Sequence, residues 1–119
     1  MVRCNKGTSA VELGMLLPVI VFMFLGAFDG GMVLWTRHTL QYAVEETARY
    51  AYANPTASDS ALVSKANSYL SGFGSPASCC TTYSDGSTTY RQLTITYNYQ
   101  WLTPFVTSST VTSTVRIPQ

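Results

Sequence analysis

The sequence carries little charge and almost no histidine. Charged residues make up 11% of its 119 residues, against about 25% in an ordinary soluble domain. The formal net charge is +1, and the few Lys and Arg residues are scattered, so they form no basic field. We therefore expect no nucleic-acid partner.

Groups for catalysis or metal binding are equally scarce. The three cysteines are Cys4 and the adjacent pair Cys79-Cys80, and none of their spacings resembles a zinc site. The single histidine, His38, has no acid and nucleophile arranged about it, and no glycine-rich phosphate loop is present. We expect no enzymatic activity, no metal and no cofactor.

What the sequence does have is one apolar run. Ala10 to Phe28 is nineteen residues long with Glu12 as its only charge, close to the roughly twenty residues that span a bilayer. No Ala-x-Ala cleavage site follows the run, so we expect a retained anchor and not a secretory signal. Arg3 and Lys6 precede it, which predicts a cytoplasmic N-terminus.

These limits predict three segments. Residues 1–7 would form a leader, residues 8–35 a transmembrane helix and residues 36–119 an exported domain. The chain is then a single-pass protein of the cytoplasmic membrane whose C-terminal domain lies outside. Its apolar segment makes the lipid bilayer its first expected partner.

Three residues are unusual in a plain anchor. An ionised Glu12 is costly in lipid unless it points to water or finds a partner, such as the terminal amine that cleavage before Thr8 would create. Pro18 cannot donate to the carbonyl of Gly14, and it is either a tolerated proline or a flex point. Asp29 is either a carboxylate at the outer interface or an inter-subunit contact.

The run from Gly7 to Glu12 resembles the class III signal of type IV pilin-like proteins. Such proteins are cut after the glycine, and their glutamate is fifth in the mature chain, as Glu12 would be here. The resemblance implies a processing site between Gly7 and Thr8 and a role for Glu12 in packing and processing. Thr8 replaces the phenylalanine that is usual in type IVa pilins and type II secretion pseudopilins.

A closer resemblance is to the TadE-like minor pilins of the tight-adherence (Tad) pilus. These typically show a Glu, a Leu-Pro, an Asp-x-Gly, an aromatic and a basic residue in that order. The corresponding residues here are Glu12, Leu17-Pro18, Asp29-Gly30-Gly31, Trp35 and Arg37, with further likeness over Thr39–Ala53, at Tyr97-Asn98-Tyr99 with Pro104, and near Arg116. One departure is Met32, where the family often has Arg.

This resemblance implies a structural protein that assembles or initiates an adhesive Tad (Flp) pilus. Its implied partners are a prepilin peptidase, a TadF-like minor pilin, the major pilin and an inner-membrane assembly platform, and it would finally lie in the extracellular pilus. Two alternatives stay open. One is a minor pseudopilin of a type II secretion or competence system, and the other is a signal-anchored binding module that presents Tyr97, Tyr99 and Trp101 to a ligand such as a glycan.

The cysteine pair lies in the expected exported domain. Cys79 and Cys80 could form a vicinal disulfide, bridges to another chain, or two free thiols, and we favour the vicinal disulfide. Cys4 would leave with the leader and cannot pair with either. The pair lacks the two-residue spacer of a thioredoxin-like thiol, so a redox catalyst is disfavoured.

The sequence pattern of the exported part predicts an α+β fold. The long helix can continue from the membrane as an amphipathic helix to Ala53, about 70 Å in all, with a Glu45–Arg49 pair on its polar side. A shorter helix capped by Ser58 or Asp59 should follow. Alternating residues then predict an antiparallel sheet of about three strands, whose inner face would include Leu93, Ile95, Tyr97, Tyr99, Trp101, Val111, Val115 and Ile117.

Overall fold

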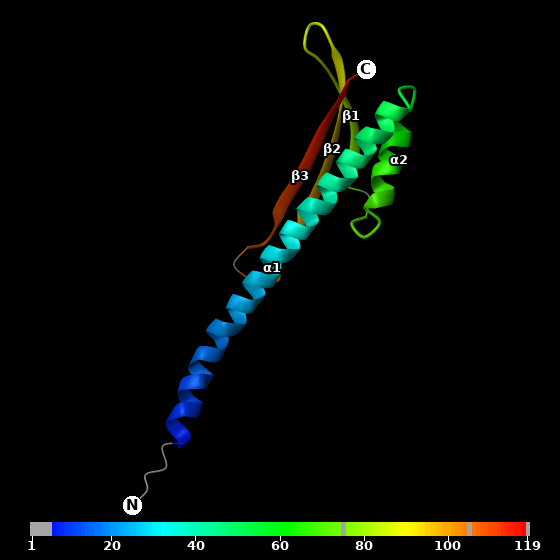
Figure 1. The fold of residues 1–119 in the computed structure, drawn as a ribbon. Helices are drawn as coiled ribbons and strands as arrows, with labels where there is room; N and C mark the ends of the chain where they lie inside the picture. Colours follow the sequence, from blue (N-terminus) through cyan, green and yellow to red (C-terminus); the bar gives the residue numbers. More distant parts are fainter. Residues whose placement is uncertain (1–5, 75, 105, 119) are drawn as a thin grey trace, which may run out of the picture.

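The computed structural model describes residues 6–74, 76–104 and 106–118. Helix α1 (Lys6–Ala53) and helix α2 (Asp59–Tyr69) precede strands β1 (Ala77–Ser84), β2 (Thr89–Tyr99) and β3 (Ser109–Pro118). The molecule measures 89 × 27 × 17 Å, because one half of α1 projects beyond everything else (Figure 1). The predicted α+β fold, with its long N-terminal helix, short second helix and three-stranded antiparallel sheet, is confirmed.

Helix α1 runs unbroken through Pro18. A proline inside a helix removes one backbone hydrogen bond, but the apolar residues on both sides keep the helical conformation. The helix ends just before Pro55. The backbone N–H of Asn54 still donates to the carbonyl of Tyr50 at 3.0 Å. The single rod therefore joins the apolar segment to the folded head, as the sequence predicts.

Helix α2 starts at the expected cap. The Ser58 Oγ accepts a hydrogen bond from the backbone N–H of Ala61 at 3.3 Å, which satisfies one of the free donors of the first turn. Leu62, Ala66 and Leu70 are buried at the spacing of one helical face. This stripe seats α2 beside α1 and under the sheet.

The sheet has the order β1-β2-β3, with both pairs antiparallel. Gly86 adopts a positive φ of 72° in the tight turn between β1 and β2, a conformation that suits glycine. A bulge interrupts the first pairing between Ser78 and Thr81, and it contains the cysteine pair. The second pairing is continuous from Tyr90↔Pro118 to Tyr99↔Ser109.

One face of the sheet packs on the two helices, which form the second layer (Figure 1). The buried positions of β2 alternate as predicted, with Leu93 and Ile95 fully buried and Tyr99 8% exposed. Trp101 lies beyond the end of β2. The rest of the core comes from both helices and β3, namely Leu40, Ala43, Val44, Ala48, Ala51, Leu62, Ala66, Leu70 and Ile117.

The polar side of α1 differs from the expectation in one pair. Arg49 lies 3.5 Å from Glu46, three residues away, and not beside Glu45. Glu45 instead accepts a hydrogen bond from the Gln41 side chain at 3.1 Å. Such exposed pairs contribute only about 0.2–0.5 kcal/mol each, so the exchange leaves the helix unaffected.

Candidate functional site

The first half of α1 is an apolar surface that the rest of the chain leaves uncovered. From residue 9 onwards it meets the length and hydropathy of a membrane span, with a mean hydropathy of 2.2 over its most apolar window and none of that window buried. Met15 is 77% and Phe24 is 74% exposed. Soluble proteins rarely expose such a continuous apolar surface to water, so the helix suits a membrane anchor.

A buried carboxylate marks the point where this apolar run ends. Asp29 directly follows Phe28 and has no exposed surface. Its Oδ1 accepts hydrogen bonds from the Tyr99 hydroxyl and from the backbone N–H of Leu102, both at 3.2 Å. Its Oδ2 accepts one from the backbone N–H of Thr103 at 3.0 Å. We call these four residues the Asp29 clamp.

The clamp joins three parts of the chain through one side chain. Asp29 comes from α1, Tyr99 ends β2, and Leu102 and Thr103 lie in the connection to β3. Three donors compensate for the removal of a carboxylate from water. Burial, and then the hydrogen bond to the Asp29 carboxylate and its charge, raise the pKa of Tyr99 above its ordinary value, so the phenol remains a donor at neutral pH.

Sequence analysis left two interpretations open for Asp29, a carboxylate at the outer interface and an inter-subunit contact, and the structure adds a set of contacts within the chain. The hydrogen bonds of the carboxylate lie within the chain. Sequence analysis did not find its partners, because two of them are backbone N–H groups in a loop and have no side-chain signature. The available signal was Tyr99, a residue with a hydroxyl at the end of a strand predicted to face the helix.

The other residues singled out on α1 lie in its free half. The bond between Gly7 and Thr8 falls within the first helical residues of α1, while Cys4 lies outside the described residues. Glu12 is exposed, and within the described residues it has no ion-pair partner. A Cβ added at Gly14 would meet nothing within 4 Å, so the space beside Pro18 is open to lipid or to another molecule.

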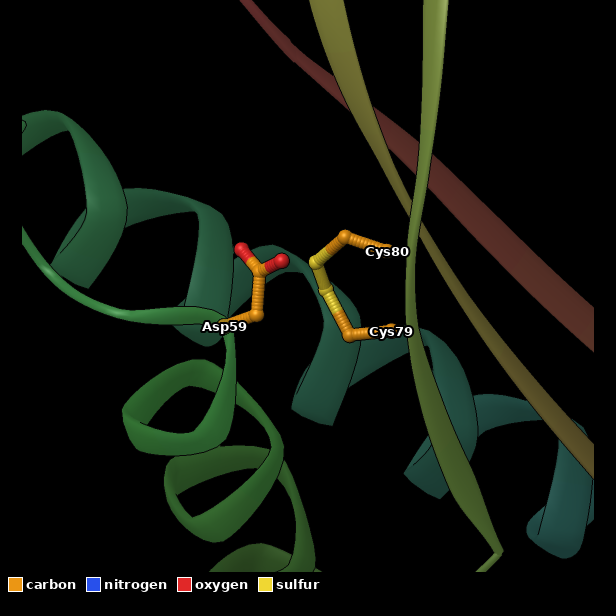
Figure 2. A group of neighbouring side chains, drawn as sticks. All are labelled: Asp59, Cys79 and Cys80. Carbon is orange, nitrogen blue, oxygen red and sulfur yellow. A yellow bond between two sulfur atoms is a disulfide. The ribbon is translucent and has the colours of Figure 1, made fainter.

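The cysteine pair lies in the bulge of β1, facing the start of α2 (Figure 2). The structure joins Cys79 and Cys80 by a disulfide. The two sulfur atoms and the Asp59 carboxylate lie within 4.8 Å of one another. Sulfur atoms in a disulfide are not the thiolates that metal ions bind, so in this state the cluster offers a single carboxylate.

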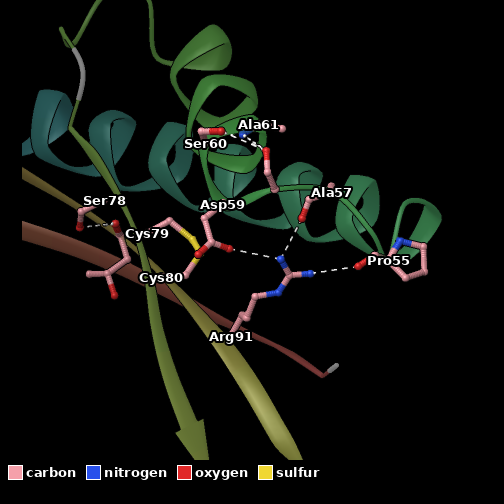
Figure 3. The surroundings of a disulfide bond; sticks show 11 residues. Pro55, Ala57, Asp59, Ser60, Ala61, Ser78, Cys79, Cys80 and Arg91 are labelled. Atoms are coloured by element: carbon pink, nitrogen blue, oxygen red, sulfur yellow. Dashed lines mark hydrogen bonds and ion pairs between the residues drawn. A yellow bond between two sulfur atoms is a disulfide. The ribbon is translucent and has the colours of Figure 1, made fainter.

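That carboxylate has a second neighbour, Arg91 (Figure 3). The Arg91 guanidinium lies 3.2 Å from Asp59 and donates to the backbone carbonyls of Ala57 at 2.9 Å and Pro55 at 3.3 Å. Arg91 projects from β2 and is 8% exposed. It therefore secures the turn between α1 and α2 to the sheet, a role that sequence analysis missed.

A shallow groove follows the border between α1 and β3. Its larger hollow, about 400 Å³, is lined by Arg37, Gln41 and Glu45 on the helix and by residues 112–115 on the strand. A second hollow of about 310 Å³ continues it past Arg37 to Ser109. Both are open and mixed in polarity, which suits contact with another polypeptide better than a small-molecule site.

The fold and the clamp define a helix-anchored protein that carries one small α+β head. Residues 7–49 match the family model described as TadE-like protein, so this segment is similar to that family. The match confirms the resemblance given by the ordered residues from Glu12 to Arg37, and it connects the chain with Tad pilus systems. No curated protein and no solved structure matches the chain.

Proposed function

We propose that this protein is a structural minor pilin that is cut between Gly7 and Thr8 by a prepilin peptidase and helps to assemble or initiate a Tad (Flp) pilus. The observation that carries the proposal is the division of α1 at Asp29. Before it the helix is apolar and exposed, and after it one face of the helix packs into the head from Thr36 onward, while Leu34 and Trp35 stay exposed. A membrane-held subunit that later packs among other helices needs this division.

Glu12 has the second role in this proposal. Its exposed carboxylate lies four residues after Thr8, near the end of an uncovered apolar helix. After cleavage, the new terminal amine of Thr8 or of a neighbouring subunit is the natural partner for that charge. This pairing would set the register between subunits in the cytoplasmic membrane, with the N-terminus inside and the head outside.

The partners follow from the same proposal. They are a prepilin peptidase, a TadF-like minor pilin, the major pilin, an inner-membrane assembly platform and the bilayer. A pseudopilin of a type II secretion or competence system would have the same fold and differ in these partners. We propose no enzymatic role.

The packing of Tyr97, Tyr99 and Trp101 disfavours the alternative of an aromatic ligand face. Tyr99 is buried in the Asp29 clamp, and Tyr97 packs edge-on against Phe73 with ring centroids 5.0 Å apart. The Trp101 indole N–H donates to the Ser109 hydroxyl at 2.8 Å. These side chains are occupied with packing and are not presented on the outer sheet face.

The test is the mass and N-terminal sequence of the protein from native membranes, beside a Gly7→Ala control. A chain that starts at Thr8, with the control left uncut, would establish a prepilin substrate. A native chain that keeps residues 1–7 would refute processing. Pulling down the cut protein with candidate pilus and secretion partners then separates the Tad pilus from the pseudopilin alternative.

A further inference from the structure

The connection between β2 and β3 lies beside the end of the apolar run. It leaves the sheet at the end nearest the free half of α1 (Figure 1). Asp29 holds the backbone N–H groups of Leu102 and Thr103 at 3.2 and 3.0 Å, and Phe28 immediately precedes Asp29. Leu102 is therefore fixed at the depth of Asp29, the first charged residue after the run from Ala10 to Phe28, although α1 stays uncharged from there to Trp35.

This connection exposes large apolar side chains. Leu102 is 62% and Val106 is 41% exposed, and no charged residue occurs from Gln100 to Ser108. The turn at the opposite end of the sheet, between β1 and β2, is instead Asp85-Gly86-Ser87. The end of the head with the β2–β3 connection is thus apolar and suits contact with lipid, whereas the end with the β1–β2 turn is polar and suits contact with water.

The polar groups of the connection are already satisfied where it meets α1. The N–H groups of Leu102 and Thr103 donate to Asp29, and the Trp101 indole N–H donates to Ser109. Unsatisfied donors are what make an irregular backbone costly near lipid. Tryptophan is also enriched at the boundary between lipid and water.

We propose that Leu102 and Val106 form a lipid-contacting foot, which enters the interfacial layer of the leaflet through which α1 emerges. The inference rests on the proposed membrane anchoring and adds a second contact to it. The Asp29 clamp positions the foot, and the hydrocarbon-spanning part of α1 ends at Phe28, before the end at residue 35 expected from the sequence. Because the foot carries no charge, an uncharged phosphatidylcholine surface is sufficient to bind it.

The test uses full-length protein in phosphatidylcholine vesicles, prepared with and without bromine on the acyl chains near the headgroup. Bromine quenches tryptophan fluorescence on contact. The sequence has two tryptophans, so Trp35→Phe leaves Trp101, beside Leu102, as the only reporter. We expect the brominated lipid to lower Trp101 emission and Leu102→Gln to restore much of it.

Two reporters placed in a Trp35→Phe, Trp101→Phe background serve as controls. Phe24→Trp lies in the apolar run, where the side chain is 74% exposed, and Tyr83→Trp lies at the far end of the sheet, where it is 49% exposed. We expect bromine to quench the first and not the second. Asp29→Ala should release the loop and reduce quenching of Trp101.

The outcomes separate the two proposals. If bromine quenches Phe24→Trp and not Trp101, the anchor stands and the foot is refuted. The same holds if Trp101 is also protected from quenching by acrylamide in the water, because a neighbouring subunit and not lipid would then cover it. If Phe24→Trp is not quenched, the membrane anchor itself fails. Quenching of Trp101 that Leu102→Gln leaves unchanged would also overturn the foot.

Discussion

Replacing Arg91 by methionine should destabilise the head, because this guanidinium binds the turn between the two helices. Hydrogen bonds from a charged donor contribute about 1.5–3 kcal/mol each, and Arg91 makes two to the carbonyls of Ala57 and Pro55. The ion pair to Asp59 adds little, since the Asp59 side chain is 56% exposed. Methionine keeps the apolar stem.

One cost of Arg91 offsets part of this gain. Its Nε atom is buried without a hydrogen-bond partner, and an unsatisfied buried donor costs about 1–3 kcal/mol. Arg91→Met removes that cost together with the two carbonyl bonds. The net expectation is a loss of about 2 kcal/mol in the free energy of unfolding.

The assay is guanidinium chloride unfolding of the full-length protein in detergent micelles, followed by near-UV circular dichroism. The midpoint should fall while the slope stays constant. Arg116→Met is the matched control, because Arg116 is exposed on the other sheet face with its guanidinium 5.4 Å from the centre of the Tyr83 ring. An exposed contact of this kind contributes about 0.5–1 kcal/mol. Equal midpoints for the two variants would refute the reasoning about Arg91.

Three further predictions concern the core, the clamp and the cysteines. Leu93→Ala should lower the free energy of unfolding by about 2–5 kcal/mol, measured by the same denaturation, because Leu93 is fully buried between the sheet and the helices. Since the pKa of Tyr99 in the folded state is raised above its ordinary value of 10.0, its stabilising effect is complete below pH 10 and is lost as the pH rises through the folded pKa. In a pH titration followed by tyrosinate absorbance, one tyrosine should ionise at a higher pH than the others. Tyr99→Phe should remove this last step of the titration. Iodoacetamide should modify Cys79 and Cys80 only after reduction, and mass spectrometry that finds both alkylated beforehand would exclude the disulfide.

The local elements could be predicted because each has its own signal along the chain. Pro55 ends α1, Ser58 caps α2, and the period-two alternation from Leu93 to Tyr99 sets the buried face of β2. These features depend on hydrogen bonds and burial within a few residues. The same alternation placed Tyr97 on the inner face, where it packs against Phe73, but periodicity could not show that Phe73 would be its neighbour.

The long-range polar contacts could not be predicted, and a physical reason accounts for each. Arg91 occupies an inner-face position on β2 where alternation predicts an apolar residue, and its acceptors lie more than thirty residues away. Glu45 and Glu46 lie four and three residues before Arg49, so both spacings allow a pair, and the structure pairs Arg49 with Glu46 while Glu45 bonds to Gln41. Which groups an arginine pairs with depends on the hydrogen bonds that the neighbouring side chains make in the folded protein.

The Asp29 clamp depends on the backbone of the loop more than on the side chains of the loop. Two of its three hydrogen bonds come from the backbone of Leu102 and Thr103, which any residue but proline can supply. A chain could therefore change the sequence of this loop and keep the clamp, as long as the loop returns to the same place on α1. The clamp thus needs the Asp29 carboxylate from α1 and the Tyr99 hydroxyl from β2, and from the loop it needs only a backbone that reaches α1.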